Sequence, residues 1–347
     1  MFAITHYLWH MIDFRSDTVT RPTPGMLKAM HEAPLGDDVF GEDPTINHLE
    51  QFAAGLFGME AGIFCPSGTM TNQIAIKCHT QPGDEVICDH LSHIYQYEGG
   101  GIAFNSGASV RLLQGDRGRI TATQVLGAIN PDDIHKPVTT LVSLENTANR
   151  AGGSCYDFDE IRSIRKVCDQ HQLKLHLDGA RLFNALVAKN ETCKQYGEVF
   201  DTISICLSKG LGAPVGSLLL GPASFIKKAR RFRKVFGGGM RQAGMLAAAG
   251  LYALEHHVQR LQEDHHHTQL LADTLRQKDF VGEILPVETN IVIFEVKGRF
   301  TAPDLVTILK RSNILALAIS PTQIRLVVHL DITPAMIETT IQTIKAL

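Results

Sequence analysis

The sequence predicts an α/β protein with a mostly parallel sheet, because polar residues follow the ends of two neighbouring strand-like runs. Leu173 to Leu177 is a short, mostly apolar run that ends at Asp178, and Thr202 to Leu207 is followed by Ser-Lys, with Lys209 opening a glycine-rich turn. Such runs are typical of buried parallel strands. A helix from about Arg181 fits the interval between them. A right-handed crossover would then bring Asp178 and Lys209 to one sheet edge, where ligands of open α/β sheets bind.

Asp178 and Lys209 together suggest a site for pyridoxal phosphate (PLP). An amine held among small apolar residues, as Lys209 is in SKGLGAP, can form a Schiff base. An acid at a neighbouring strand end could keep a pyridinium nitrogen protonated, which the PLP ring needs to act as an electron sink. The alternative is a loop lysine and an acid that caps a helix. Either residue alone favours that alternative, whereas the ordered pair favours the PLP site.

The composition indicates a globular enzyme with two domains. The chain has 347 residues, 44% hydrophobic and 20% charged, and therefore exceeds the usual size of a single core. We expect an N-terminal extension over residues 1–10, a large domain over residues 11–258 and a small α+β domain over residues 259–347. The formal net charge of −3 argues against nucleic acid or an anionic membrane as partner.

The cysteines and histidines give no sign of a disulfide framework or a metal site. The seven cysteines lack CxxC spacing, which favours free thiols in a reducing compartment and predicts a cytoplasmic protein. The groups His256-His257 and His265 to His267 lie in a charged segment that reads as a solvated helix, so we expect no metal there. The start of the chain lacks the features of a signal peptide, and no apolar run has the length of a transmembrane helix.

A turn near residue 67 is a candidate phosphate site. The strand-like run Ile63 to Cys65 leads through Ser67 and Gly68 into a helix that is expected to begin near Thr69. Amides and hydroxyls at a helix N-terminus bind phosphate, although an ordinary capped helix would have the same pattern. The chain has neither GxxxxGKS/T nor GxGxxG, so the common nucleotide fingerprints are absent.

Three further side chains are candidates for ligand binding. His93 follows the strand-like run EVICD and could stack its ring on a cofactor, although a lone histidine is more often structural. Arg241 comes directly after GGGM and could reach a phosphate or simply lie on the surface. Arg325, near the start of the strand-like run QIRLVVHL, could bind a carboxylate with its rigid guanidinium fork.

Eight motifs together resemble the L-threonine aldolases, including the low-specificity and allo-threonine types. These are PLP-dependent enzymes of fold type I, the aspartate-aminotransferase-like group, in the beta-eliminating lyase superfamily. The resemblance covers Met11 to Leu347, and its motifs follow the order of the family: MIDFRSDTVTRPT, GDDVFGEDPT, PSGTMTNQIA, HIYQYEGGG, LENTANR, LHLDGARLFNA, SKGLGAPVGS and GGGMRQAG.

The resemblance implies a role for each matching residue. The implied catalytic residues are Lys209 as the Schiff-base lysine, Asp178 as the partner of the pyridine nitrogen, and His93 as the histidine that stacks on the ring. The implied cofactor-binding residues are Ser67, Gly68, Thr69, His93, Asp178, Arg181, Lys209 and Arg241. The implied substrate-carboxylate residues are Ser16, Arg181 and Arg325.

The resemblance also implies a reaction and an assembly. It implies cleavage of L-threonine, L-allo-threonine and related β-hydroxy-α-amino acids to glycine and an aldehyde, in threonine catabolism and glycine biosynthesis. In the family, the arginine that matches Arg241 reaches the phosphate of a neighbouring subunit, which implies at least a dimer, and we expect a homotetramer.

One departure from the family pattern and three alternatives remain. Members usually carry a histidine within ENTHN, near the substrate hydroxyl, whereas this chain has Ala148 in ENTANR, so the preferred diastereomer is open.

β-Elimination and amino-acid racemisation on the same scaffold are two alternatives, because a fold does not determine its chemistry. A PLP-binding protein without turnover is the third.

Overall fold

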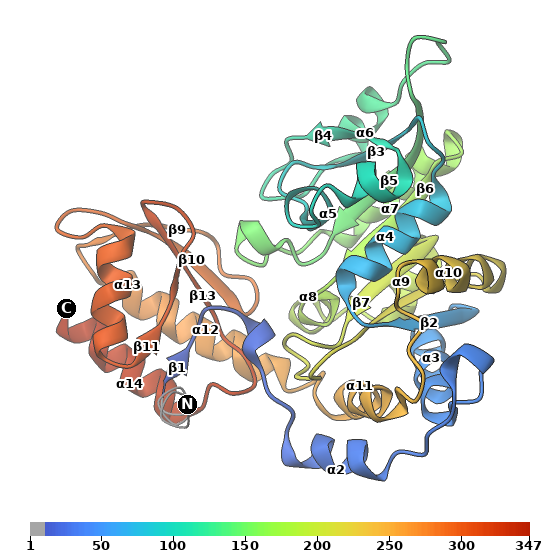
Figure 1. The fold of residues 1–347 in the computed structure, drawn as a ribbon. Helices are drawn as coiled ribbons and strands as arrows, with labels where there is room; N and C mark the ends of the chain where they lie inside the picture. The colour runs from blue at the N-terminus through green and yellow to red at the C-terminus, as the bar shows by residue number, and fades with distance from the viewer. Residues whose placement is uncertain (1–10) are drawn as a thin grey trace.

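The molecule has two lobes, each with its own sheet (Figure 1). The computed structural model describes residues 11–347, so the expected extension over residues 1–10 lies outside the described residues. The described chain starts in the lobe that also holds the C-terminus, crosses to the larger lobe, and returns (Figure 1).

The larger lobe is built on a seven-stranded sheet with the order β2-β8-β7-β6-β5-β3-β4. Its strands are β2 (Ala61–Cys65), β3 (Asp84–Asp89), β4 (Ser109–Leu113), β5 (Val138–Glu145), β6 (Lys174–Gly179), β7 (Thr202–Cys206) and β8 (Ser217–Gly221). The strands from β4 to β7 pair in parallel, and β8 is antiparallel to both of its neighbours. The expected α/β class with a mostly parallel sheet is confirmed.

The direction of β8 decides where the candidate residues meet. Because β2 and β7 both run antiparallel to β8, they point the same way. The carboxyl ends of β2, β3, β5, β6 and β7 therefore share one edge of the sheet. The turn after β2, which carries the candidate phosphate site, opens at the same edge as the turn after β7, which carries Lys209.

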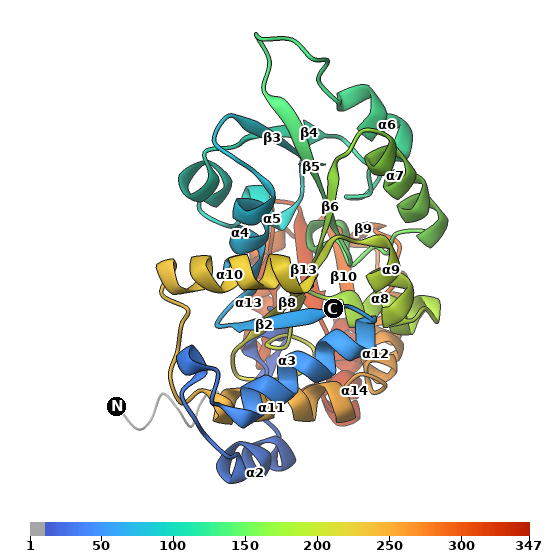
Figure 2. The same cartoon turned by 90° about the vertical axis from the view of Figure 1, so that its right-hand side faces the viewer.

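Helices cover both faces of this sheet (Figure 2). Those of the larger lobe are α2 (Pro24–Glu32), α3 (Pro44–Phe57), α4 (Gly68–His79), α5 (His93–Gln96), α6 (Ala122–Ala128), α7 (Phe158–Gln170), α8 (Leu182–Lys189), α9 (Cys193–Val199), α10 (Ala223–Val235) and α11 (Gly244–His256). Helices α4 and α10 lie on one face, and α3, α7 and α9 lie on the other. The interval between β6 and β7 holds two helices, α8 and α9, rather than the single expected one.

Local sequence signals explain the helix ends. The hydroxyl of Thr23 caps α2 by accepting from the backbone N–H of Met26, with Pro24 at the first helical position. The α3 helix ends at Gly58, whose φ of 65° is left-handed and favours glycine. Both boundaries follow from residue types that are visible in the sequence.

The smaller lobe has a four-stranded antiparallel sheet with the order β12-β13-β10-β9, and a two-stranded parallel pair of β1 and β11. Its strands are β1 (Ile12–Asp13), β9 (Val281–Ile284), β10 (Ile291–Val296), β11 (Ile314–Leu315), β12 (Leu317–Ala318) and β13 (Gln323–Val327). Its helices are α12 (Leu261–Leu275), α13 (Ala302–Arg311) and α14 (Pro334–Ala346).

The start of the described chain packs with the C-terminal core. Ile12 pairs with Ile314, and Ile12 and Phe14 are buried in the same apolar cluster as Phe294 and Leu326. A division near residue 258 stays a prediction, but residues 12–14 contribute to the smaller lobe and not to a continuous domain over residues 11–258. Strand β1 has only two residues, too few for an alternating apolar pattern, so the sequence does not reveal that this segment packs with the smaller lobe.

The histidine-rich segment forms the expected helix α12, but only one of its faces is solvated. Asp264 and Thr268 are fully buried, and His265 bonds Asn184 at 3.0 Å. The seven cysteines are free and six of them are buried. Within residues 11–347, no helix combines the length and the apolar composition that crossing a membrane requires.

Candidate functional site

The site is centred on the shared sheet edge, where Asp178 and Lys209 both lie. Asp178 is buried near the end of β6, opposite Ser204 of β7. Its Oδ1 accepts from the backbone N–H of Ala180 at 3.2 Å, and its Oδ2 accepts from Nδ2 of Asn72 at 2.9 Å. A carboxylate has about four acceptor positions, so Asp178 keeps capacity for a further donor.

Lys209 lies in the turn after β7 with its amine uncommitted. Its carbonyl accepts from the hydroxyl of Thr20 at 3.0 Å and from the backbone N–H of Gly212 at 2.8 Å, and both contacts hold the turn. Within residues 11–347, Nζ of Lys209 makes no hydrogen bond or ion pair. The charge of this amine acts on both Asp17 and His93.

The turn after β2 has the features of an anion site. The hydroxyl of Ser67 caps α4 by accepting from the N–H of Met70 at 3.2 Å. The N–H groups of the first helical turn have no partner inside the helix and carry the positive end of its dipole. A Cβ at Gly68 would lie 2.5 Å from Sγ of Cys206, so only glycine permits this close approach of α4 to β7.

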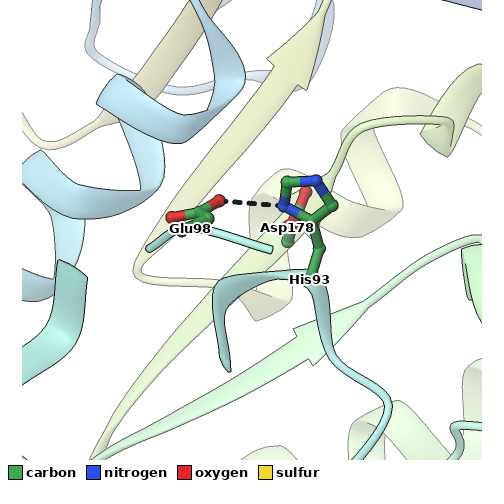
Figure 3. Close-up of side chains that lie close together, drawn as sticks. All are labelled: His93, Glu98 and Asp178. Atoms are coloured by element: carbon green, nitrogen blue, oxygen red, sulfur yellow. Dashed lines mark hydrogen bonds and ion pairs between the residues drawn. The ribbon is translucent and has the colours of Figure 1, made fainter. Parts of the chain in front are cut away.

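His93, Glu98 and Asp178 form one compact group (Figure 3). One ligand atom from each lies within 4.8 Å of the others, and Nδ1 of His93 donates to Oε1 of Glu98 at 3.1 Å. Such a group could hold a metal ion, but Glu98 also accepts from Nδ2 of Asn72 at 2.9 Å and Nε2 of Gln73 at 2.6 Å. Donors already occupy both of its oxygens, so we interpret the group as a hydrogen-bonded network.

Asn72 links the two acids of this network. Its Nδ2 donates to Asp178 and to Glu98, and its Oδ1 accepts from Nε2 of His176 at 3.2 Å. The opposite orientation of the amide would point Oδ1 at two carboxylates, so the contacts determine the orientation. Asn72 therefore fixes the spacing between Asp178 and Glu98.

Glu145, at the end of β5, holds the two segments beside Asp178. Its Oε2 accepts from the backbone N–H of His93 at 2.7 Å and its Oε1 from that of Asn149 at 2.9 Å. Burial raises the pKa of Glu145 to about 7, and the charge of Asp178, opposite it in the sheet, adds to the rise. Three carboxyl groups are thus buried at this edge of the sheet.

Arg181 and Arg325 are the two arginines implied to bind the substrate carboxylate. Of these, only Arg181 has its charge balanced by a carboxylate within residues 11–347. Its Nε and Nη2 donate to both oxygens of Asp17 at 2.7 Å, and its Nη1 donates to Oδ1 of Asn149 at 3.2 Å. Burial alone would raise the pKa of Asp17, but Arg181, Lys209 and His329 lower it to about 2. The pair is a buried, bidentate salt bridge.

Arg325 reaches across from β13 and has no carboxylate partner within residues 11–347. Its Nη1 donates to Oδ1 of Asn149 at 2.8 Å and its Nη2 to the carbonyl of Arg15 at 3.1 Å, while its buried Nε is unpartnered among the described residues. Burial and the nearby charge of Arg181 lower the pKa of Arg325 to about 10. Ser16 follows Arg15 in the chain, and its hydroxyl accepts from the backbone N–H of Thr18 at 3.2 Å.

Arg241 is the predicted residue that lies apart from the others. Its side chain is 54% exposed, and its Nη1 pairs with Asp37 at 2.9 Å.

Ala148 is buried, with its Cβ packed against Gly118. His90 bonds the carbonyl of Leu113 on the edge strand at 3.3 Å, away from Asp178, whereas His93 turns toward it.

Comparison with known proteins then places the chain in a family. The family model described as beta-eliminating lyase matches residues 13–299. The chain belongs to the beta-eliminating lyase family. It is 45% identical over 323 residues to the low specificity L-threonine aldolase of Escherichia coli K12, covering 93% of this chain and 95% of that protein. It is 41% identical to the probable low-specificity L-threonine aldolase 2 of Arabidopsis thaliana, covering 94% of each. The resemblance to threonine aldolases is therefore confirmed.

The fold of this family member recurs in solved structures. A threonine aldolase of Leishmania major superposes with a TM-score of 0.84 at 21% identity, covering 96% of this chain and 99% of that one. A structure of SPT with PLP superposes with a TM-score of 0.75 at 16% identity, covering 97% and 87%. Both likenesses confirm the expected PLP fold type I.

Five polar residues of the site carry no role in the sequence analysis: Asp17, Asn72, Glu98, Glu145 and Asn149. Signals for two of them exist in the sequence. Glu145 ends a strand-like run at the same edge as Asp178, and Asn72 lies one helical turn after Gly68 and Thr69. The other three depend on contacts between distant segments, such as the pairing of Asp17 with Arg181.

Proposed function

We propose that this lyase-family chain uses PLP to cleave L-threonine, L-allo-threonine and related β-hydroxy-α-amino acids to glycine and an aldehyde, which is acetaldehyde for threonine. The single observation that carries the proposal is the arrangement of charge. A buried acid and an uncommitted lysine, whose charges both act on His93, lie on one side of the site, and a buried arginine without a carboxylate partner among residues 11–347 lies on the other. Relatives that are 41% to 45% identical carry the matching names.

The residues present fit PLP. The uncommitted amine of Lys209 would hold the cofactor covalently, and the remaining acceptor capacity of Asp178 would bind the protonated ring nitrogen. The turn of Ser67, Gly68 and Thr69 would bind the phosphate, because the missing Cβ at Gly68 permits close packing and the helix N-terminus favours an anion. When bound, PLP supplies an electron sink for the pair released by the breaking Cα–Cβ bond.

Arg325 and Arg181 would orient the amino-acid substrate by binding its carboxylate. Arg325 has a buried Nε without a partner among residues 11–347, and its other two nitrogens bond only neutral oxygens, whereas Arg181 already pairs with the carboxylate of Asp17. We therefore infer that Arg325 is the main carboxylate ligand. Arg181 and Ser16 would support it. Fixing the carboxylate selects which bond to Cα is aligned for cleavage.

His93 would act nearest to the substrate hydroxyl. Its Nδ1 is committed to Glu98, and Ala148 provides no hydrogen-bonding group. Nε2 of His93 has no hydrogen-bond partner among residues 11–347, and it would receive the hydroxyl proton directly or through a water. The same histidine would contact the cofactor ring, as the family resemblance implies.

Assembly and location extend the proposal. The exposed position of Arg241, paired with Asp37, supports a role toward a neighbouring subunit, where it would bind that subunit's phosphate. At least a dimer follows from that role, and we propose a homotetramer. Seven free cysteines support a cytoplasmic location.

One experiment separates the alternatives. Purified protein with PLP would be mixed with threonine, allo-threonine, phenylserine and serine, and the products identified by mass spectrometry and chiral chromatography. The proposal predicts glycine plus the matching aldehyde. Pyruvate or 2-oxobutyrate would indicate elimination, the D-isomer would indicate racemisation, and no product would support a PLP-binding protein without turnover.

A further inference from the structure

Glu98 is a buried acid to which neither the family name nor the proposed mechanism assigns a role. Its side chain is 0% exposed, whereas that of its partner His93 is 28% exposed. A carboxylate removed from water this completely needs donors around it. Asn72, Gln73 and His93 supply them at 2.9, 2.6 and 3.1 Å.

These contacts determine which nitrogen of His93 carries a proton. The groups that contact Glu98 are two side-chain amides that donate through nitrogen, so its oxygens act as acceptors. Nδ1 of His93 must then be the donor in its contact with Glu98. In the neutral imidazole the other nitrogen, Nε2, is therefore unprotonated and can accept.

The surrounding chain is built to hold Glu98 in place. A Cβ at Gly101 would lie 2.6 Å from the amide of Gln73, so a side chain there would displace this amide from its place beside Glu98. The other end of the Gln73 amide accepts from Nδ2 of Asn105 at 3.0 Å. Asn72 ties Glu98 to Asp178 through a single amide nitrogen.

We propose that Glu98 is a positioning residue for the cleavage reaction: it fixes His93 with Nδ1 protonated and Nε2 free to accept a proton, and it stabilises the imidazolium that then forms. The inference rests on the proposed function. In the step concerned, Nε2 takes the β-hydroxyl proton, the O–H electron pair forms the carbonyl of the aldehyde, and the Cα–Cβ pair is left on the Cα side of the substrate. A proton delivered to Cα then gives glycine.

The electrostatics of His93 agree with this role. Burial lowers the pKa of the His93 imidazole, but the hydrogen bond to Glu98 and the charges of Asp178 and Glu98 outweigh burial and raise it. The titratable or charged groups that face His93 are Glu98 and Tyr97 on its own segment, Glu145 on β5, Asp178 on β6, and Lys209 after β7, while α4 contributes the neutral amides of Asn72 and Gln73. Of these groups, only Glu98 forms a hydrogen bond with the imidazole ring of His93.

The test replaces Glu98 with a neutral residue of the same shape. In Glu98→Gln, the acidic limb of the pH profile of kcat/KM for L-threonine should move to lower pH by roughly one unit or more. The maximal kcat should fall by roughly tenfold or more, because a weaker base accepts the proton, while KM changes little. Glu98→Asp keeps the charge at a longer distance and should shift the limb in the same direction by less.

A second readout does not depend on turnover. The His93 imidazole would be titrated by NMR in histidine-labelled protein, assigned with His93→Asn, and should move to lower pH together with the kinetic limb in Glu98→Gln. Glu50→Gln is the matched control, because Glu50 is also a buried, hydrogen-bonded carboxylate but lies at Arg230, outside the site. That control should leave both readouts unchanged.

The outcomes separate this inference from the proposed function. Active wild-type protein with an unmoved His93 titration and an unmoved limb in Glu98→Gln would overturn the role of Glu98. If Glu98→Gln does not fold but Glu98→Asp does, an acidic limb of the kcat/KM profile that stays at the wild-type pH in Glu98→Asp would also overturn the role of Glu98. Wild-type protein that releases no aldehyde would instead overturn the proposed function, since the NMR titration would still show whether Glu98 controls the protonation of His93.

Discussion

The two sides of the site differ in the sign and the balance of their buried charge. On the larger-lobe side, three carboxyl groups of Asp178, Glu98 and Glu145 are buried around one histidine. On the side where the lobes meet, two arginines are buried but only one of them pairs with a carboxylate: Arg181 bonds Asp17, whereas Arg325 bonds the neutral Asn149. One side carries an excess of acid and the other an excess of base.

This difference supports the proposed placement of the ligand. A buried charge without a counter-charge is unfavourable, so each side is incomplete without a ligand of opposite sign. The acidic side suits a protonated ring nitrogen, and the basic side suits the carboxylate of an amino acid. The charge of Lys209 acts on a group of each side, on Asp17 and on His93.

The largest expected effect is at Lys209, whose charge acts on both sides. Lys209→Ala should reduce turnover by roughly a thousandfold or more, because the amine that would hold the cofactor is lost. Borohydride reduction of the wild-type protein with PLP, followed by peptide mapping, should place the adduct on Lys209. Lys234→Ala serves as control and should retain activity. An adduct on Lys227 or Lys234 would show that the site is assigned wrongly.

The acidic side can be tested at its centre with Asp178→Asn. The amide keeps the shape but cannot stabilise a protonated ring nitrogen, so kcat should fall by roughly a hundredfold or more. Steady-state kinetics at saturating PLP would measure this. Asp264→Asn, at a buried carboxylate paired with Arg260, should leave kcat nearly unchanged. Equal losses in both variants would mean that Asp178 acts through stability alone.

The excess of acid also predicts a pH dependence of stability. The pKa of Glu145 is raised from 4.5 to about 7, chiefly by burial, so folding favours its protonated form. That contribution is complete below pH 4.5 and is lost as the pH rises through 7, a change of about 3 kcal/mol at 1.36 kcal/mol per unit. Relative to Glu145→Gln, the wild type should therefore lose stability between pH 5 and pH 8.

Urea unfolding of both proteins at several pH values would measure this difference. Glu160→Gln, at a carboxylate that bonds the N–H of Ala122 away from the site, provides the control and should show little pH-dependent difference. A wild-type advantage over Glu145→Gln that is constant from pH 5 to pH 8 would show that Glu145 is ionised throughout, and that the acidic side is better compensated than its contacts indicate.

The smallest effect is expected at Ala148. A methyl group cannot hydrogen-bond the substrate hydroxyl, so the wild type should discriminate weakly between L-threonine and L-allo-threonine and accept bulkier β-substituents. A histidine there can form one bond worth roughly 0.5 to 1.5 kcal/mol, so Ala148→His should change the ratio of kcat/KM for the two diastereomers about two- to tenfold. Ala151→His, in the same 3₁₀ turn, is the control. A wild type that is already strict would place selectivity elsewhere.

Much of the fold was predictable from the sequence, because it depends on local signals. Apolar runs that end in Asp178 and before Lys209 mark two parallel strands, and Thr23 with Pro24 marks a helix start. The location of residues 12–14 was not predictable, since two paired residues have no periodicity. The second helix between β6 and β7 was missed because its seven residues, Cys193–Val199, are too few to show a clear apolar face.

The positions of candidate residues at a strand end or in a turn were predictable, as for Asp178 and Gly68, although their roles stay predictions. It was not predictable where a role depends on contacts across the fold. Asn149 looks like any loop asparagine, yet its Oδ1 accepts from both Arg181 and Arg325. Glu98 follows a short helix without a pattern, and its burial depends on α4.

The division of charge between the two sides is tested most directly by Arg325→Ala. Kinetics would give KM for L-threonine, and fluorescence titration would give Kd for PLP. Arg15→Ala is the control, because it removes an exposed side chain but keeps the carbonyl that Arg325 bonds. KM should rise by roughly tenfold or more in Arg325→Ala, with Kd for PLP unchanged. Loss of PLP binding with an unchanged KM in the remaining active enzyme would contradict the division.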